Sequence, residues 1–366
     1  MFPSRRIVTS GGDVFRNEYS LQFDGTDSYV NCGNDSSLQI AGDMTYSCWF
    51  KTSSSNSLLA LIDKIGSNTG MFIFLSAGKP RIWIGTGSAV VNWENIGSDL
   101  RDGNWHHLVV VNDEDVATYA YIDGTAYNNG TATDMSANTT DNFNIGSYST
   151  TAWEFDGLID EVAIWNTALS SSQVKTLYNN REPFNAKNIA LSSLKAYYRM
   201  GDGVLDDRQT NGLVADQVNA TLGSELLITT GWSTDDGWTL SGGTLTFSDT
   251  GNGGTILTAG EMTNGTGMAI GKVYKLQYTI SNLSSGTADI TIHNSDGNVQ
   301  IANENATNGS YTKYFTPTHD GKGFRFTGLA SSGSSWDVTD YSLKEVSGNA
   351  GVMVNFDGSD FKTDTH

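Results

Sequence analysis

The sequence predicts an all-β protein built as two antiparallel jelly-roll β-sandwiches in tandem. Short apolar runs with a period of two recur along its 366 residues, and each is bounded by Gly, Asn, Asp or Ser. The 41 glycines, four prolines and 17% charged residues fit a compact, turn-rich chain better than a disordered one. The length is sufficient for two domains that each bury a core.

The first sandwich is predicted over residues 20–180. Its clearest strand patterns are 21–30, 45–51, 70–75, 80–85, 102–111, 118–124 and 154–166. The pair Asp123 and Gly124 predicts a tight hairpin. One short helix is expected from Ser170 to Tyr178, because a serine cap precedes it.

The rest of the chain divides into four further parts. Residues 1–19 are expected to be an N-terminal arm with too little apolar surface for a core, 181–223 a packed linker, 224–347 the second sandwich, and 348–366 a C-terminal tail. In the tail, residues 354–360 repeat 21–27 almost position for position. The tail therefore either adds a strand to a sheet of this or a neighbouring subunit, or the repeat is chance.

Charge and the absence of targeting patterns argue against several classes of protein. A net charge of −19 and a pI near 4.4 argue against a nucleic-acid partner, since the 21 basic residues are spread along the chain. No apolar run approaches the roughly 20 residues of a membrane span, and the N-terminus lacks the apolar stretch of a signal peptide. The two cysteines, Cys32 and Cys48, either pair or stay free; we favour two buried free thiols.

Three segments carry a family resemblance. Residues 154–178 (EFDGLIDEVAIWNTALSSSQVKTLY) closely resemble the closing strand of laminin G-like, concanavalin A-type jelly rolls. Residues 21–30 and 102–111 match the opening and a central strand of the same family, in the same order. The resemblance covers about 20–180. At the ends of the second sandwich, 231–243 and 336–346 resemble carbohydrate-binding-module jelly rolls.

The laminin G resemblance implies a calcium site between the first and last strands. The matching carboxylates are Asp24, Asp27, Asp156 and Asp160. The alternative is that Asp24 and Asp156 serve Asp-Gly turns, while Asp160 accepts backbone hydrogen bonds.

Carbohydrate binding needs an exposed aromatic face with planar polar groups around it. Trp49, Trp105 and Trp165 match the family's core positions, so Trp83, Trp93 and Trp153 are the candidate platforms. Aromatic residues in strands are nevertheless often part of a core.

No enzymatic activity is expected. Glucanases with this architecture carry "E-x-D-x-x-E" on one strand, and Glu154 with Asp156 reproduces only the first half. The sequence shows no nucleophile elbow, phosphate loop or zinc spacing.

The combination is most similar to laminin G-containing appendage and decoration proteins of tailed bacteriophages. That resemblance implies a non-enzymatic virion protein, a capsid decoration, fibre or tail appendage, that binds host-surface glycans weakly and multivalently. We expect a homo-oligomer, a trimer, attached to other virion proteins through residues 1–19 and assembled in the host cytoplasm. The alternative is an extracellular protein, namely a secreted or cell-surface carbohydrate-binding module or a fragment of a carbohydrate-active enzyme.

Overall fold

The computed structural model describes residues 15–149, 152–203, 206, 212–218, 221–227, 233–234, 237–248, 254–257, 267–269, 272–285, 288–294, 299–315, 317, 324–328, 335–347, 350–354, 356 and 359–363. The chain forms two compact units. One comprises Met1–Ala220 together with Gly348–His366, and the other comprises Thr221–Ser347. Both are built from antiparallel strands, so the predicted all-β class is confirmed. Among the described residues, no helix is both long and apolar enough to cross a membrane.

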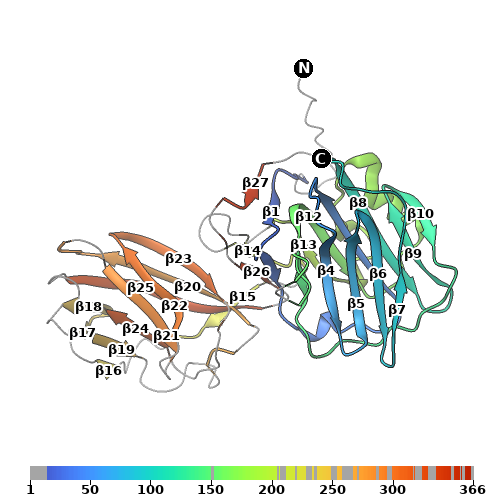
Figure 1. Ribbon diagram of the computed structural model, residues 1–366. Coiled ribbons are helices and arrows are strands. Elements are labelled where there is room, and N and C mark those ends of the chain that lie inside the picture. The colour runs from blue at the N-terminus through green and yellow to red at the C-terminus, as the bar shows by residue number, and fades with distance from the viewer. Residues whose placement is uncertain are drawn as a thin grey trace. The chain divides into compact units, whose positions relative to one another are not determined.

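The first unit is a sandwich of two eight-stranded sheets (Figure 1). The β12 sheet has the order β10-β9-β8-β3-β12-β1-β27, with β13 also paired to β12. Its strands are β1 (Ser20–Asp24), β3 (Met44–Lys51), β8 (Trp105–Asp113), β9 (Ala117–Ile122), β10 (Thr125–Asn128), β12 (Asp156–Trp165), β13 (Leu194–Tyr198) and β27 (Phe361–Lys362).

The β5 sheet has the order β14-β26-β2-β11-β4-β5-β6-β7, and its β4–β7 part faces the viewer in Figure 1. Its strands are β2 (Tyr29–Asn31), β4 (Leu58–Gly66), β5 (Thr69–Ser76), β6 (Lys79–Thr86), β7 (Val90–Trp93), β11 (Asn144–Ile145), β14 (Leu213–Val214) and β26 (Gly351–Val354).

The core of the first unit lies between these two sheets. Phe23, Phe50, Ile73 and Ile82 are all fully buried in it. Because side chains alternate across a strand, every second residue of β5 and β6 faces this core and the others face away from it. Cys32 and Cys48 lie in the same core as buried free thiols, and desolvation raises the pKa of both.

The predicted helix forms as α1 (Ser171–Tyr178), where the side chains of Ser170 and Gln173 make a capping box. Val174 and Leu177 bury its inner face against the outer side of the β12 sheet, where Trp165 is completely buried. Single 3₁₀ turns occur at η1 (Ser36–Leu38), η2 (Asn179–Arg181), η3 (Ala186–Asn188) and η4 (Leu191–Ser193).

The C-terminal residues complete the first unit. β26 pairs with β2 and β14, and β27 pairs with β1, so the tail adds strands to both sheets. Residues 181–218, expected as a linker, belong to this unit too, because β13 pairs with β12 and Tyr198 bridges to Asp216. The second unit is therefore inserted into the first along the chain, which differs from the expected tandem order.

Part of the expected N-terminal arm also lies on the first unit. The Arg199 guanidinium is 4.4 Å from the centre of the Phe15 ring, and Asn17 Nδ2 donates to Asp160 over 2.8 Å. The backbone amides of Glu18 and Tyr19 donate to the Asp202 carboxylate. Residues 15–19 thus bind their own subunit, whereas 1–14 lie outside the described residues.

The second unit has a six-stranded sheet, with the order β17-β18-β25-β20-β23 and β15 on β25, and a five-stranded sheet, β16-β19-β24-β21-β22. Trp238, Phe247, Tyr274, Trp336 and Leu343 are buried in its core. Its strands are β15 (Thr221–Glu225), β16 (Ser233–Thr234), β17 (Trp238–Ser241), β18 (Thr244–Ser248), β19 (Gly254–Leu257), β20 (Val273–Ser281), β21 (Ala288–Asn294), β22 (Val299–Ala306), β23 (Gly309–Phe315), β24 (Phe324–Gly328) and β25 (Ser335–Ser347).

The insertion yields a testable prediction. Val214 and Gly351 are paired across β14 and β26, so a short Gly-Ser linker can replace residues 221–347 without straining the first unit. We expect this deletion to keep a cooperative melting transition and native near-ultraviolet circular dichroism.

Deleting 221–366 instead removes β26 and β27 as well, and uncovers core residues such as Val30. This second deletion should lower the melting temperature clearly. Equal melting temperatures for the two deletions would show that the tail does not stabilise the first unit.

Candidate functional site

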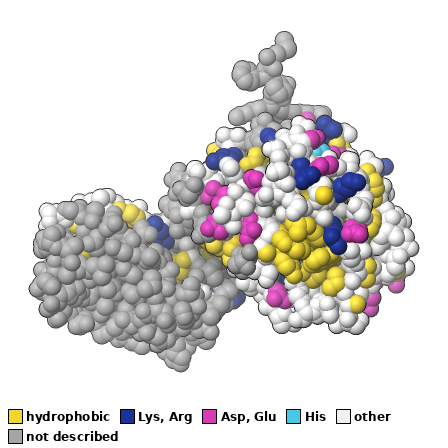
Figure 2. Space-filling model, in the orientation of Figure 1, with side chains coloured by type: hydrophobic (Ala, Val, Ile, Leu, Met, Phe, Trp, Pro, Cys, Tyr) yellow, Lys and Arg dark blue, Asp and Glu magenta, His cyan; other side chains and the backbone are white. Residues whose placement is uncertain are grey.

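An aromatic cluster lies on the outer face of the β5 sheet, away from the core. We define it as Phe72, Phe74, Trp83, Tyr148 and Trp153. The two phenylalanines are fully buried, while the other three rings are partly exposed. The Tyr148 and Trp153 rings stack with centroids 4.8 Å apart, and the Trp83 ring meets Trp153 nearly edge-on at 5.6 Å. Figure 2 shows hydrophobic side chains gathered over β4–β6.

Strand register assembles this cluster. Asn144, Asp63, Phe72, Trp83 and Asn92 are successive cross-strand partners on β11, β4, β5, β6 and β7. Residues opposite each other in antiparallel strands project from the same face, so these five side chains form one row. Its centre is aromatic and its ends are polar.

A polar margin lies beside Trp83. Asn92 Oδ1 accepts hydrogen bonds from Trp83 Nε1 at 3.0 Å and from Arg81 Nε at 2.8 Å. The Arg81 guanidinium lies 5.6 Å from the Phe74 ring centre and 5.7 Å from that of Trp83, and it pairs with Glu94 at 3.2 Å. A planar amide and a planar guanidinium therefore border the partly exposed Trp83 ring, and Glu94 balances the charge of Arg81.

The structure separates the three tryptophans proposed from the sequence. Trp83 and Trp153 share the aromatic cluster, but Trp93 packs against the core between the sheets. The reason is register, because Trp93 is the cross-strand partner of Ile82, which faces the core. Trp93 is therefore not part of this platform.

Sequence reasoning also missed five members of the site, namely Phe72, Phe74, Tyr148, Arg81 and Asn92. Phe72 and Phe74 lie in a strand that is apolar at every position from 71 to 75, which signals that both of its faces are covered. Tyr148 and Arg81 carried no comparable signal, since only the folded sheet places them beside tryptophan.

The four carboxylates proposed for calcium do not fit one metal site. Asp24 and Asp156 are cross-strand partners, but Asp24 Oδ1 accepts hydrogen bonds from Thr26, Asp27 and Ser28 in an Asp turn. No group of three or more His, Cys, Asp or Glu side chains in the described part of the chain is arranged to hold a metal ion. Calcium binding itself stays a prediction, tested by comparing melting curves in chelator and in millimolar calcium.

Asp160 lies in a different environment, a buried cluster of acidic and basic side chains beneath residues 15–19. Its carboxylate accepts from Asn17 Nδ2 and from the Glu161 amide. Glu161 pairs with Arg199 at 3.2 Å and accepts from the Tyr197 hydroxyl. Desolvation raises the pKa of Asp160 well above its usual value and that of Glu161 to about 8.

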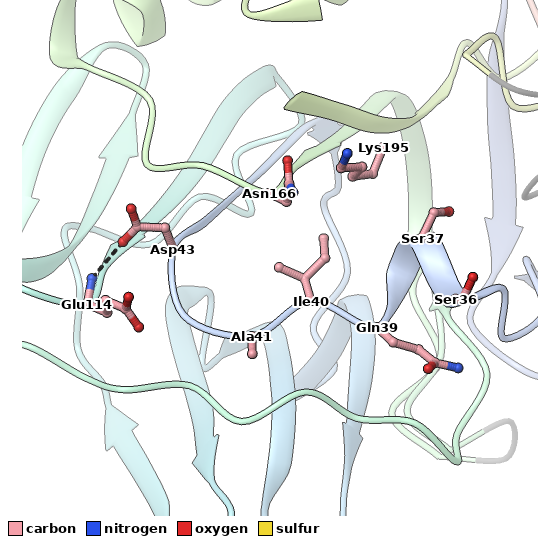
Figure 3. Close-up of a pocket in the computed structure, with 9 residues that line it drawn as sticks. All are labelled: Ser36, Ser37, Gln39, Ile40, Ala41, Asp43, Glu114, Asn166 and Lys195. Atoms are coloured by element: carbon pink, nitrogen blue, oxygen red, sulfur yellow. Dashed lines mark hydrogen bonds between the residues drawn. The ribbon is translucent and has the colours of Figure 1, made fainter. Parts of the chain in front are cut away.

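A hollow of about 510 Å³ lies elsewhere on the first unit (Figure 3). It is lined by Ser36, Ser37, Gln39, Ile40, Ala41, Asp43, Glu114, Asn166 and Lys195. The Glu114 amide donates to Asp43 at one side of it, and Lys195 lies on the other. None of the lining residues is aromatic, so the hollow offers no stacking surface for a sugar ring.

The buried carboxyls predict how stability depends on pH. In the folded state Asp160 and Glu161 bind protons more tightly than in the unfolded chain. The stability that this contributes is complete below about pH 4 and is lost as the pH rises towards 8. We therefore expect chemical denaturation to give a lower free energy of unfolding at pH 8 than at pH 5, with a weaker dependence in Glu161→Gln.

The matched control is Glu182→Gln, which removes an exposed carboxylate. It should keep the wild-type pH dependence. A Glu161→Gln protein with the full wild-type slope would contradict the assignment.

Comparison with known proteins finds a family match within the first unit. Residues 24–175 match a family model described as the concanavalin A-like lectin/glucanases superfamily. No curated protein matches the chain.

Three solved structures illustrate the similarity. The Ruminococcus gnavus IT-sialidase CBM40 is 14% identical and aligns over 43% of this chain and 96% of its own, with a TM-score of 0.35. A putative carbohydrate binding protein from Bacteroides ovatus is 15% identical over 57% of this chain and 60% of its own, with a TM-score of 0.41. The SAP-like pentraxin of Limulus polyphemus is 16% identical and aligns over 44% of this chain and 82% of its own, with a TM-score of 0.33. The family match shows that residues 24–175 of this chain form a concanavalin A-like jelly-roll domain.

Proposed function

We propose that the chain binds carbohydrate through the aromatic cluster on the β5 sheet and does not turn it over. The observation that carries this proposal is the pair of partly exposed rings, Trp83 and Trp153, bordered by Asn92 and Arg81. The apolar C–H face of a pyranose packs on such rings, while its hydroxyl groups exchange hydrogen bonds with planar amide and guanidinium groups. The match to a lectin and glucanase family supports the same ligand class.

The charge balance of the margin favours a neutral sugar. The Arg81 guanidinium lies beside the cluster and pairs with Glu94, so these two side chains together present no net charge for an acidic sugar to neutralise. Binding at an open sheet face buries only one side of the ligand, so each site should be weak. Repetition of sites in an oligomer would raise avidity through effective concentration.

The wider proposal is a virion protein that attaches its particle to host-surface glycans as a homo-oligomer. Its support is the sequence resemblance to phage appendage and decoration proteins described above. Mass spectrometry of purified particles tests this context, and absence of the chain from them would favour the alternative of an extracellular carbohydrate-binding module.

The binding proposal predicts the effect of removing either exposed tryptophan. Trp83→Ala and Trp153→Ala should each raise the dissociation constant of a neutral glycan by about twofold to tenfold, because each loses one stacking contact. Glycan-array screening selects the ligand, and calorimetric titration then measures the affinity.

The control is Trp105→Ala, which removes another partly buried tryptophan, from β8 of the β12 sheet. It should leave glycan affinity unchanged. If Trp105→Ala weakens binding as much as the cluster variants, or if no glycan binds the wild type, the cluster is not a sugar site.

A further inference from the structure

Two of the three partly exposed rings of the cluster, Tyr148 and Trp153, lie on a strained hairpin, whose described residues are 146–149 and 152–153. Tyr148 and Ala152 form an isolated antiparallel bridge, and Trp153 follows directly. Ser149 and Trp153 have φ angles of 51° and 58°, in the left-handed region that residues with a side chain rarely occupy. Such a conformation persists only where surrounding contacts enforce it.

The contacts that enforce it come from β4. The register of β4 against β5 shifts between Ala60 and Ile62. Next to this irregularity, the Ala60 amide donates to the Trp153 carbonyl at 2.7 Å, and the Gly146 amide donates to the Leu61 carbonyl at 3.1 Å. These bonds hold the two ends of the hairpin.

The middle of the hairpin is held by a buried carboxylate. Asp63 Oδ2 accepts the Ser149 amide at 2.8 Å, and its Oδ1 accepts the Ile65 amide at 3.1 Å. Asp63 is only 3% exposed, and it occupies the row that continues through Phe72 to Trp83. It therefore contacts the hairpin from the same sheet face that carries the cluster.

We propose that Asp63 is the positioning residue of the aromatic cluster, holding Tyr148 and Trp153 in their binding geometry through the Ser149 amide. An ionised carboxylate has acceptor sites for both amide donors at once. A neutral carboxyl or an amide in its place offers one good acceptor and adds a donor, so one of the two backbone amides loses its partner. The part of this inference that concerns affinity rests on the proposed function.

Protonation provides a way to test the role without mutation. Desolvation raises the pKa of Asp63 to about 6. Hydrogen bonds from Ser149, Ile65 and Asn144 favour the ionised form and act in the opposite direction. The charged or titratable groups that act on Asp63 or respond to it are Asp141, Lys64 and Tyr46. Below about pH 6 the carboxyl becomes neutral and the hairpin should loosen, although the same protonation stabilises the folded state as a whole.

The experiment uses the full chain labelled with 5-fluorotryptophan, with the resonances of Trp83 and Trp153 assigned from Trp83→Phe and Trp153→Phe. In the wild type, we expect the Trp153 resonance to shift between pH 7.5 and pH 5 with a midpoint near 6. In Asp63→Asn this titration should disappear. The histidines of the chain are present in both proteins, so the difference between the two titrations reports Asp63.

Affinity and stability complete the test. Acidification to pH 5 should raise the glycan dissociation constant about threefold to tenfold in the wild type, and Asp63→Asn should show the weaker affinity at both pH values. Its melting temperature at pH 7.5 should not fall, because the substitution removes a desolvated charge. Asp99→Asn, which removes an exposed carboxylate bound to Arg101, should behave as the wild type throughout.

Two results would overturn the positioning role. One is a Trp153 resonance that titrates equally in the wild type and in Asp63→Asn. The other is an Asp63→Asn protein whose melting temperature falls in step with its affinity, which indicates general destabilisation. If no glycan binds but the Trp153 titration still depends on Asp63, the positioning role stands and the proposed function fails.

Discussion

Cross-strand register in the β5 sheet is the constraint on which the candidate site depends. Each pairing from β11 to β7 aligns one residue of the row that runs from Asn144 through Phe72 to Asn92. A slip of one residue in any pairing would turn the aromatic rings into the core and bring core residues to the surface. The core between the sheets prevents this slip, since Ile73 and Ile82 have to stay buried. Packing on one face of the sheet therefore fixes the chemistry on the other.

The second constraint is closure of the first unit by distant parts of the chain. β26 and β27 return after the inserted unit to pair with β2 and β1, near the opening of the sandwich. Long-range pairings of this kind cost loop-closure entropy before they contribute stability. Because Thr221–Ser347 forms a compact unit with a core of its own, the insertion costs less loop-closure entropy than a flexible segment of the same length.

The first unit has two regions with buried acidic side chains, and these side chains have different roles. Asp160 and Glu161 lie under residues 15–19, where hydrogen bonds to Asn17 and an ion pair with Arg199 offset their desolvation. Asp63 instead contacts a strained hairpin beside exposed rings. Burying a carboxylate beside a surface site costs desolvation free energy, and at Asp63 the hydrogen bonds from the Ser149 and Ile65 amides offset part of that cost.

Local pattern and composition were sufficient to predict the all-β class and the helix after Ser170, and the family resemblance implied the jelly-roll character of the first unit. Period-two alternation, turn residues and a capping box act over a few residues, so they can be read without knowledge of the fold. The resemblance left Trp83, Trp93 and Trp153 outside the family's core positions. It did not separate Trp93 from the other two, because neighbouring strands decide which face each residue occupies.

The composition of the aromatic site, the places of the carboxylates and the pairing of the tail were decided by tertiary structure alone. Tyr148, Arg81 and Asn92 become a site only when β6, β7 and the hairpin meet on one sheet face. The carboxylates predicted to bind calcium separate for the same reason: Asp24 accepts hydrogen bonds from its own turn, while Asp160, in the middle of β12, accepts one from Asn17. The place of the tail depended on pairings between residues more than 300 positions apart, such as Leu21 with Phe361. Contacts at such separations leave no local pattern, because they arise from the folded geometry of the whole unit.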